Sequence, residues 1–118
     1  MIIIYLIVGD IMYLSIKRKK IEIIELNSLI SRLKGLKFVF EPINYGVLFP
    51  KKKSITTIFL CQKIDIVMTN KENKILYIYT SVKSEKYFLP KLKVYNIYFL
   101  PLGTGENLEI GDTLYLRN

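Results

Sequence analysis

The sequence has no histidine, no tryptophan and a single cysteine among its 118 residues. Without histidine there is no imidazole base to activate a serine or cysteine nucleophile, and the usual ligands of a zinc site are missing as well. Cys61 stands alone, so it cannot form an internal disulfide. We therefore predict no catalytic, cofactor-binding or metal-binding residue, and any hydrolytic chemistry here would have to depend on carboxylates or lysines.

A membrane-spanning stretch is lacking too. The apolar run Ile2–Val8 is far shorter than the ~20 residues that cross a bilayer. A signal peptide needs a basic segment before such a run and a small-residue cleavage site after it, whereas Asp10 follows here. We interpret residues 1–11 as an N-terminal extension, or Met12 as the true start, and residues 12–118 as one domain. A cytoplasmic location is favoured over export, and no transmembrane segment is expected.

Acidic residues are scarce relative to basic ones. Eighteen lysines and arginines against ten aspartates and glutamates give a net charge of +8. Such an excess indicates attraction to nucleic acid or to an anionic membrane surface. AT-rich coding is the favoured explanation here, because lysine, isoleucine, asparagine and tyrosine are abundant together.

Apolar residues are plentiful, and their spacing predicts many short strands. Hydrophobic residues make up 51% of the chain, which is too apolar for disorder and enough for one core at this length. The basic turn Lys17–Lys20 separates two short β patterns, and Asn70–Asn73 separates two longer ones. The predicted strands are Met12–Ile16, Ile21–Ile24, Tyr45–Phe49, Ser54–Cys61, Ile64–Thr69, Lys74–Thr80, Val94–Leu100 and Thr113–Leu116.

One helix is predicted near the N-terminus. Leu26, Leu29, Ile30 and Leu33 have the i, i+3, i+4, i+7 spacing of an amphipathic helix, and Gly35 follows as a C-terminal cap. A second, shorter helical turn is expected where Thr104 can act as a cap. A single short helix among many strands predicts a mainly β fold, a compact β-sandwich or barrel.

The order of five short motifs resembles one known family. Its members carry R-x-x-G-L-M, G-M-L-F, W-M-K-N-T, P-L-D-I-I-F and L-E-L-P-x-G-T with a terminal G-D, and the chain is similar to the small bacterial and archaeal family called domain of unknown function 192. The resemblance implies a jelly-roll type of sandwich and no established activity or cofactor. Thr56–Leu60 lacks the aromatic, lysine and amide of the third motif, and Phe99 replaces the glutamate of the last. The matching segments are Arg32–Lys37, Tyr45–Phe49, Lys63–Met68, Tyr98–Thr104 and Gly111–Asp112.

The residues at these motif positions are interpreted as structural. Arg32 can bind an anionic ligand or pair with Asp65 or Asp112, and Asp65 can form an acid/base couple with Glu106 or Asp112 or be hydrogen-bonded in the core. The structural interpretation is favoured in both cases. The motif residues concerned are Arg32, Gly35, Gly46, Asp65, Pro101, Gly103, Gly111 and Asp112.

The lysines offer the other candidate site. Lys51, Lys52, Lys53 and Lys63, with further lysines and aromatic residues between 83 and 95, form a basic surface for single-stranded nucleic acid if the fold brings them together. Otherwise they are solvated loops. The leading hypothesis is a non-catalytic binding or interaction module for an unidentified partner, with an anionic ligand or nucleic acid as candidates. A nucleic-acid-binding domain and a weak carboxylate-based enzyme are the alternatives.

Overall fold

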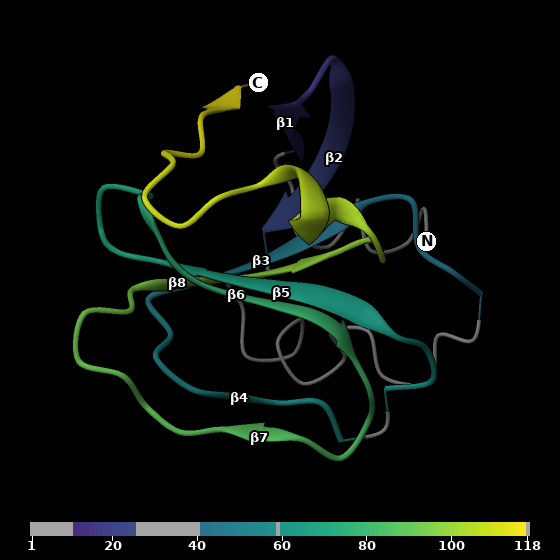
Figure 1. The fold of residues 1–118 in the computed structure, drawn as a ribbon, viewed down its shortest axis with the longest axis vertical. Coiled ribbons are helices and arrows are strands. Elements are labelled where there is room, and N and C mark those ends of the chain that lie inside the picture. Colours follow the sequence, from purple (N-terminus) through teal and green to yellow (C-terminus); the bar gives the residue numbers. More distant parts are fainter. Residues whose placement is uncertain (1–10, 26–40, 59, 118) are drawn as a thin grey trace.

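A computed structural model describes residues 11–25, 41–58 and 60–117 (Figure 1). This part of the chain is mainly β, and its only helix is the short 3₁₀ helix η1. The elements are β1 (Ile11–Ile16), β2 (Lys19–Glu25), β3 (Gly46–Pro50), β4 (Ile55–Thr56), β5 (Ile64–Thr69), β6 (Ile75–Val82), β7 (Tyr87–Phe88), β8 (Asn96–Leu100), η1 (Thr104–Asn107) and β9 (Leu116–Arg117).

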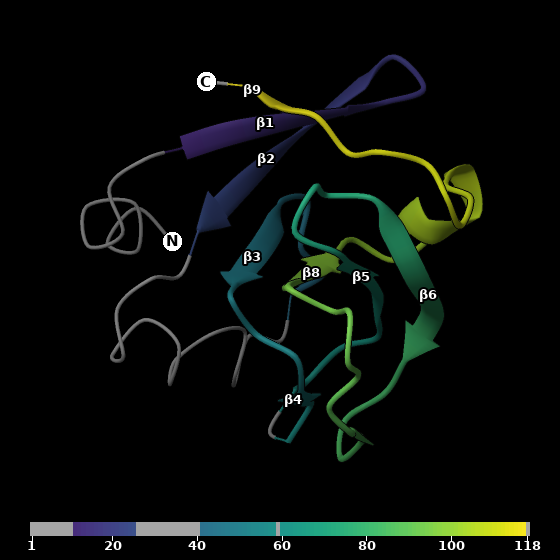
Figure 2. The same ribbon diagram turned by 90° about the vertical axis from the view of Figure 1, so that its left-hand side faces the viewer.

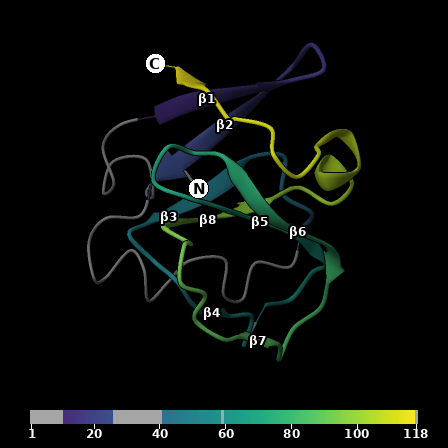
Figure 3. The same ribbon diagram turned by 60° about the vertical axis from the view of Figure 1, so that its left-hand side comes forward.

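Seven of the strands form one mixed sheet in the order β6-β5-β8-β3-β2-β1-β9. Its pairs are antiparallel except for β2 and β3, which run parallel with Ile23 opposite Gly46. β4 and β7 form a separate two-stranded sheet. In all three ribbon views this small sheet lies at one end of the molecule and the β1–β2 hairpin at the other (Figures 1, 2 and 3).

The C-terminal segment, residues 112–117, contacts strands at both edges of the large sheet. β9 pairs with β1, whereas a few residues earlier Thr113 forms a bridge with Lys74, next to the edge strand β6. Ile75 N–H donates to the Asp112 carbonyl at 2.8 Å, and Leu114 N–H donates to the Asn73 carbonyl at 2.9 Å. The segment therefore spans from one edge of the sheet to the other (Figure 2).

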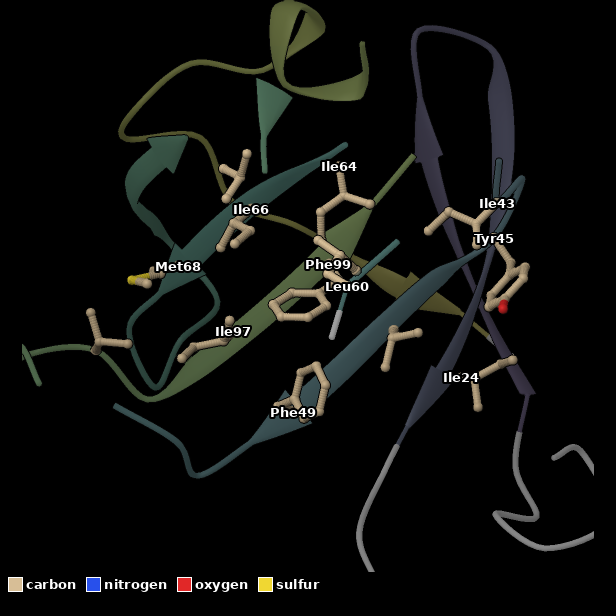
Figure 4. Close-up of a cluster of buried hydrophobic side chains, with 13 residues drawn as sticks. Ile24, Ile43, Tyr45, Phe49, Leu60, Ile64, Ile66, Met68, Ile97 and Phe99 are labelled. Atoms are coloured by element: carbon tan, nitrogen blue, oxygen red, sulfur yellow. The ribbon is translucent and has the colours of Figure 1, made fainter. Parts of the chain in front are cut away.

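Apolar side chains are buried on both faces of the sheet. Alternate residues of a strand point to opposite faces, so a strand covered on both sides is apolar throughout. β5 is such a strand: Ile64, Ile66 and Met68 join one cluster with Phe49 (Figure 4), and Val67 joins the other. The second cluster contains Leu14, Ile16, Ile21, Ile23, Leu48, Val67, Ile75, Tyr98, Leu100 and Leu114.

Both predicted hairpins are confirmed. The first turns at Lys17 and Arg18, which have positive φ values of 44° and 71°. In the second, the Asn70 side-chain oxygen accepts the backbone N–H groups of Glu72 and Lys74 at 3.0 and 2.9 Å. Such side-chain bonds are the reason asparagine favours turns.

Two local predictions are wrong. The strand expected over Ser54–Cys61 is only β4, because the Thr57 hydroxyl donates to the Lys83 carbonyl at 2.7 Å and accepts the Lys86 N–H at 2.8 Å, which turns the chain away from a ladder. Thr104 does not cap η1; Gly103 does, with a φ of 93° that a residue with a side chain rarely adopts.

The predicted helix over Leu26–Leu33 lies outside the described residues, and so do Arg32 and Gly35. Within the described part, no helix is long and apolar enough to cross a membrane.

Candidate functional site

A cleft lies where the β1–β2 hairpin faces the turn after β8. Its volume is about 540 Å³. A neighbouring hollow of about 340 Å³ shares Ile43, Pro101 and Leu102 with it and is otherwise lined by Pro42, Gln62 and Lys63. The residues that line the cleft are Ile16, Lys19, Lys20, Ile21, Ile43, Asn44, Pro101, Leu102, Gly103, Thr104 and Asn107.

Basic and amide groups supply most of the polar side chains of this lining. Lys19 and Lys20 lie at the start of β2, Asn44 lies just before β3, and Asn107 is the last residue of η1. Lys63 lines the adjoining hollow. Neither set of lining residues includes an aspartate or a glutamate. The cleft therefore has a positive electrostatic character and can bind a negatively charged group.

The turn that forms one wall of the cleft has a defined shape. Gly103 adopts the left-handed conformation, and the Thr104 N–H donates to the Pro101 carbonyl at 3.1 Å. Gly105 then packs so closely that a Cβ atom there would lie 3.1 Å from the Asp65 carboxylate. Two motif residues, Pro101 and Gly103, thus shape this wall.

Asp65 holds the turn against the sheet. Its carboxylate accepts the Gly105 N–H at 2.7 Å and the Ser81 N–H at 3.0 Å, one on each oxygen, and the residue has no exposed surface. Ser81 has a φ of 52° and lies at an irregularity in the pairing of β5 with β6. Asp65 is therefore a buried carboxylate with a backbone hydrogen bond on each oxygen.

Asp112 and Gly111 belong to another turn. The Asp112 carboxylate accepts the Glu109 N–H at 3.1 Å, and Gly111 has a φ of 100°. Both residues are exposed, and Asp112 borders a hollow of about 400 Å³ beneath the C-terminal segment. Asp65 and Asp112 therefore serve separate turns. The described residues contain no group of three or more cysteines and acidic residues that would suit a metal ion.

Gly46 has a packing role at the parallel pair. A Cβ atom at this position would lie 2.6 Å from Ile23 Cδ1, 2.8 Å from Leu100 Cδ2 and 3.3 Å from the Phe99 carbonyl oxygen.

Replacing Gly46 with alanine should therefore lower the free energy of unfolding by about 1 to 3 kcal/mol, the usual cost of overfilling a packed core. Chemical denaturation of both proteins measures the difference. Gly103→Ala is a useful comparison, because its added methyl group meets no atom within 4 Å and any loss comes from the φ of 93° alone. An unchanged midpoint for Gly46→Ala would show that β2 and β3 are not packed as described.

The predicted basic surface is divided by the fold. The Lys52 N–H donates to the Tyr95 carbonyl at 2.8 Å and Lys53 Nζ to the Leu92 carbonyl at 3.2 Å, so Lys51–Lys53 adjoin the loop before β8. Lys63 lies instead at the hollow beside Pro101. The sequence placed Lys19 and Lys20 in a solvated turn, and no local pattern indicated that they would face Thr104.

Comparison with known proteins adds information on the fold. No protein family matches the sequence, and no curated protein does. A protein of unknown function from Novosphingobium aromaticivorans is similar in structure, with a TM-score of 0.72 and 13% identity over 89% of this chain and 83% of that one. A protein classed provisionally as a transcription regulator from Sinorhizobium meliloti has a TM-score of 0.71 and 14% identity over 91% of each chain. At these identities the similarity concerns the fold alone.

Proposed function

We propose that this protein is a non-catalytic binding module that holds a small anionic ligand in the cleft between the β1–β2 hairpin and the turn Pro101–Thr104. The observation that carries the proposal is the lining of the cleft, which combines Lys19 and Lys20 with amide groups and contains no carboxylate.

Two features of the lining favour an anionic ligand. A lysine ammonium offers three donors and a full charge, and no acidic side chain in the lining neutralises it. Ile16, Ile21 and Ile43 form an apolar wall, which lowers the local dielectric constant and strengthens a charge pair formed there. A ligand with a phosphate or carboxylate group and a small apolar portion fits both features.

We also infer that the chain is a divergent member of the family called domain of unknown function 192. Three of the matching segments overlap the strands β3, β8 and β5, which are neighbours in the large sheet. The Asp65 of one segment bonds Gly105, which directly follows another. Contacts between separate motif segments support the resemblance, because a chance match of short motifs does not require them to touch.

We further propose that the large sheet is partly closed into a barrel. The C-terminal segment pairs at both edges of the sheet, and the cluster around Tyr98 lies against it through Leu114. These contacts support a partly closed barrel related to a jelly roll, and the parallel β2–β3 pair is its departure from an antiparallel barrel.

A binding experiment tests the ligand site. Inorganic phosphate and succinate are titrated into the full chain, and chemical-shift changes are followed by NMR. We expect shifts centred on Asn44 and Gly103–Asn107. The double variant Lys19→Ser, Lys20→Ser should weaken binding at least tenfold, since a hydrogen bond to a charged group contributes about 1.5 to 3 kcal/mol.

The matched control removes two exposed lysines elsewhere. Lys71→Ser, Lys74→Ser lowers the net charge equally but lies at the β5–β6 turn, so its affinity should stay within about twofold, as expected for screened charges. Equal loss in both variants, or shifts spread over all lysines, would replace the proposed site with diffuse charge attraction.

A further inference from the structure

Most of the net positive charge of the chain belongs to the end of the molecule formed by β4, β7 and their loops. We call residues 51–58 and 83–95 the basal ribbon. They contain seven lysines and one acidic residue, Glu85, a net charge of +6 out of +8 for the whole chain. β4 pairs with β7 within it, and it lies opposite the β1–β2 hairpin in every view (Figures 1, 2 and 3). The basal ribbon shares no residue with the lining of the cleft.

The same ribbon exposes large apolar side chains. Leu92 is 86% exposed, Leu89 65%, Tyr87 62% and Ile58 41%. Scattered exposed apolar residues are ordinary, but Leu89 and Leu92 lie in one loop among Lys91 and Lys93.

Hydrogen bonds fix the backbone conformation of that loop around Leu92. The Val94 N–H donates to the Lys91 carbonyl at 3.1 Å, which makes a turn around Leu92, and Lys53 Nζ donates to the Leu92 carbonyl at 3.2 Å. The Tyr95 N–H donates to the Thr69 carbonyl at 2.8 Å, which ties the end of the loop to β5. The leucine is therefore presented to solvent by a tethered turn.

Aromatic rings nearby are already engaged with one another. Lys91 Nζ lies 5.1 Å from the centre of the Tyr77 ring, Tyr77 is stacked on Tyr79 at 6.3 Å, and Tyr79 packs on Phe88 at 4.7 Å. Single-stranded nucleic acid is bound by stacking bases on free ring faces. Here Tyr77, Tyr79 and Phe88 contact one another. Tyr87 is an exposed ring, and two leucines of the same ribbon are more exposed than it is. The groups offered to a partner are therefore mainly aliphatic side chains and lysines.

We propose that the basal ribbon docks on an anionic lipid surface. Leu89 and Leu92 enter the boundary between headgroups and acyl chains, and the lysines approach the lipid phosphates and carboxylates. Membrane surfaces attract basic segments electrostatically and take up apolar side chains at the same time, which matches both properties of the ribbon. The docking leaves the cleft at the other end of the molecule open to its ligand.

Vesicle sedimentation with the full chain tests this proposal. Vesicles of phosphatidylcholine and phosphatidylserine should bind the protein at about 0.15 M salt, and vesicles of phosphatidylcholine alone should bind it far more weakly. The variant Leu89→Ser, Leu92→Ser should lose at least about tenfold in partitioning. The variant Lys51→Ser, Lys86→Ser, Lys93→Ser should lose on the order of 100-fold, because each lysine near the surface contributes roughly fivefold.

Matched controls remove the same groups elsewhere. Lys17→Ser, Lys71→Ser, Lys74→Ser takes away equal charge from exposed turns outside both the ribbon and the cleft, and Ile110→Ser, Tyr115→Ser takes away two exposed apolar side chains. Both should bind vesicles like the parent protein, and both ribbon variants should keep the parent's thermal unfolding. Equal losses in the controls would overturn the proposal. So would binding of a single-stranded oligonucleotide that competes fully with vesicles and depends on the ribbon lysines but not on Leu89 and Leu92.

Discussion

Replacing Asp65 with alanine should lower the free energy of unfolding by about 3 to 5 kcal/mol. The variant leaves two backbone N–H groups, those of Gly105 and Ser81, without the carboxylate that accepts them at 2.7 and 3.0 Å. An unsatisfied buried donor loses its full desolvation energy, about 1 to 3 kcal/mol for each group. The missing side chain also leaves a space in a site without solvent access. Urea denaturation followed by circular dichroism measures the loss.

Two further variants separate the hydrogen bonds from the volume. Asp65→Asn keeps the size of the side chain but replaces one acceptor oxygen by a donor, so we expect about half of the alanine effect. Asp112→Ala removes an exposed aspartate that also accepts a backbone N–H, and should cost about 1 kcal/mol or less. If Asp65→Ala were no more damaging than Asp112→Ala, the anchoring of η1 by Asp65 would be wrong.

The strands that the sequence predicted well are those whose turns are determined locally. Asn70 bonds the backbone two and four residues ahead, and the basic turn at Lys17 and Arg18 joins two runs of alternating burial, so both hairpins follow from nearby residues. The strand predicted over Ser54–Cys61 failed for the opposite reason. Thr57 bonds Lys83 and Lys86, which lie about 30 residues away in the chain, and no pattern within one segment reports such a partner.

Long-range pairing accounts for the rest of what the sequence did not predict. The parallel pairing of Ile23 with Gly46 and the bridge of Thr113 to Lys74 join segments whose apolar patterns would serve equally well in other strand orders. The cleft is a product of this topology, because Lys19, Asn44 and Thr104 come from three separate segments. A hydrogen-bonded core position was one of the alternatives that the sequence left for Asp65, and the structure buries its side chain and bonds both carboxylate oxygens to backbone N–H groups.

Tyr98 joins the central strand β8 to the turn between β5 and β6. The side chain is fully buried, and its hydroxyl donates to Asn73 Oδ1 at 2.7 Å. Asn73 has a φ of 65°, accepts the Thr69 hydroxyl at 3.1 Å and donates to the Leu114 carbonyl at 2.9 Å. Burial raises the pKa of Tyr98 to about 12, the hydrogen bond to Asn73 acts in the lowering direction, and the negative charge of Glu25 acts in the raising direction.

This raised pKa makes the stability of the protein sensitive to alkaline pH. Below pH 10 the tyrosine is protonated in both the folded and the unfolded chain, so its contribution is constant. Above pH 10 the unfolded chain releases the proton first, and stability falls until the pKa of about 12 of the folded protein is reached. A shift of two pKa units corresponds to about 2.7 kcal/mol, most of which should be lost by pH 12.

Tyr98→Phe should reverse the order of stability across this range. At neutral pH the variant should be less stable than the parent by about 0.5 to 1.5 kcal/mol, because the bond to Asn73 is lost. Near pH 12 it should be the more stable of the two, because it has no buried phenol to ionise. Tyr87→Phe, at a side chain that is 62% exposed, serves as the control and should follow the parent at every pH. Denaturation curves at neutral pH and through the alkaline range give the comparison, and parallel curves for the parent and Tyr98→Phe would contradict the burial of the Tyr98 hydroxyl in the folded state.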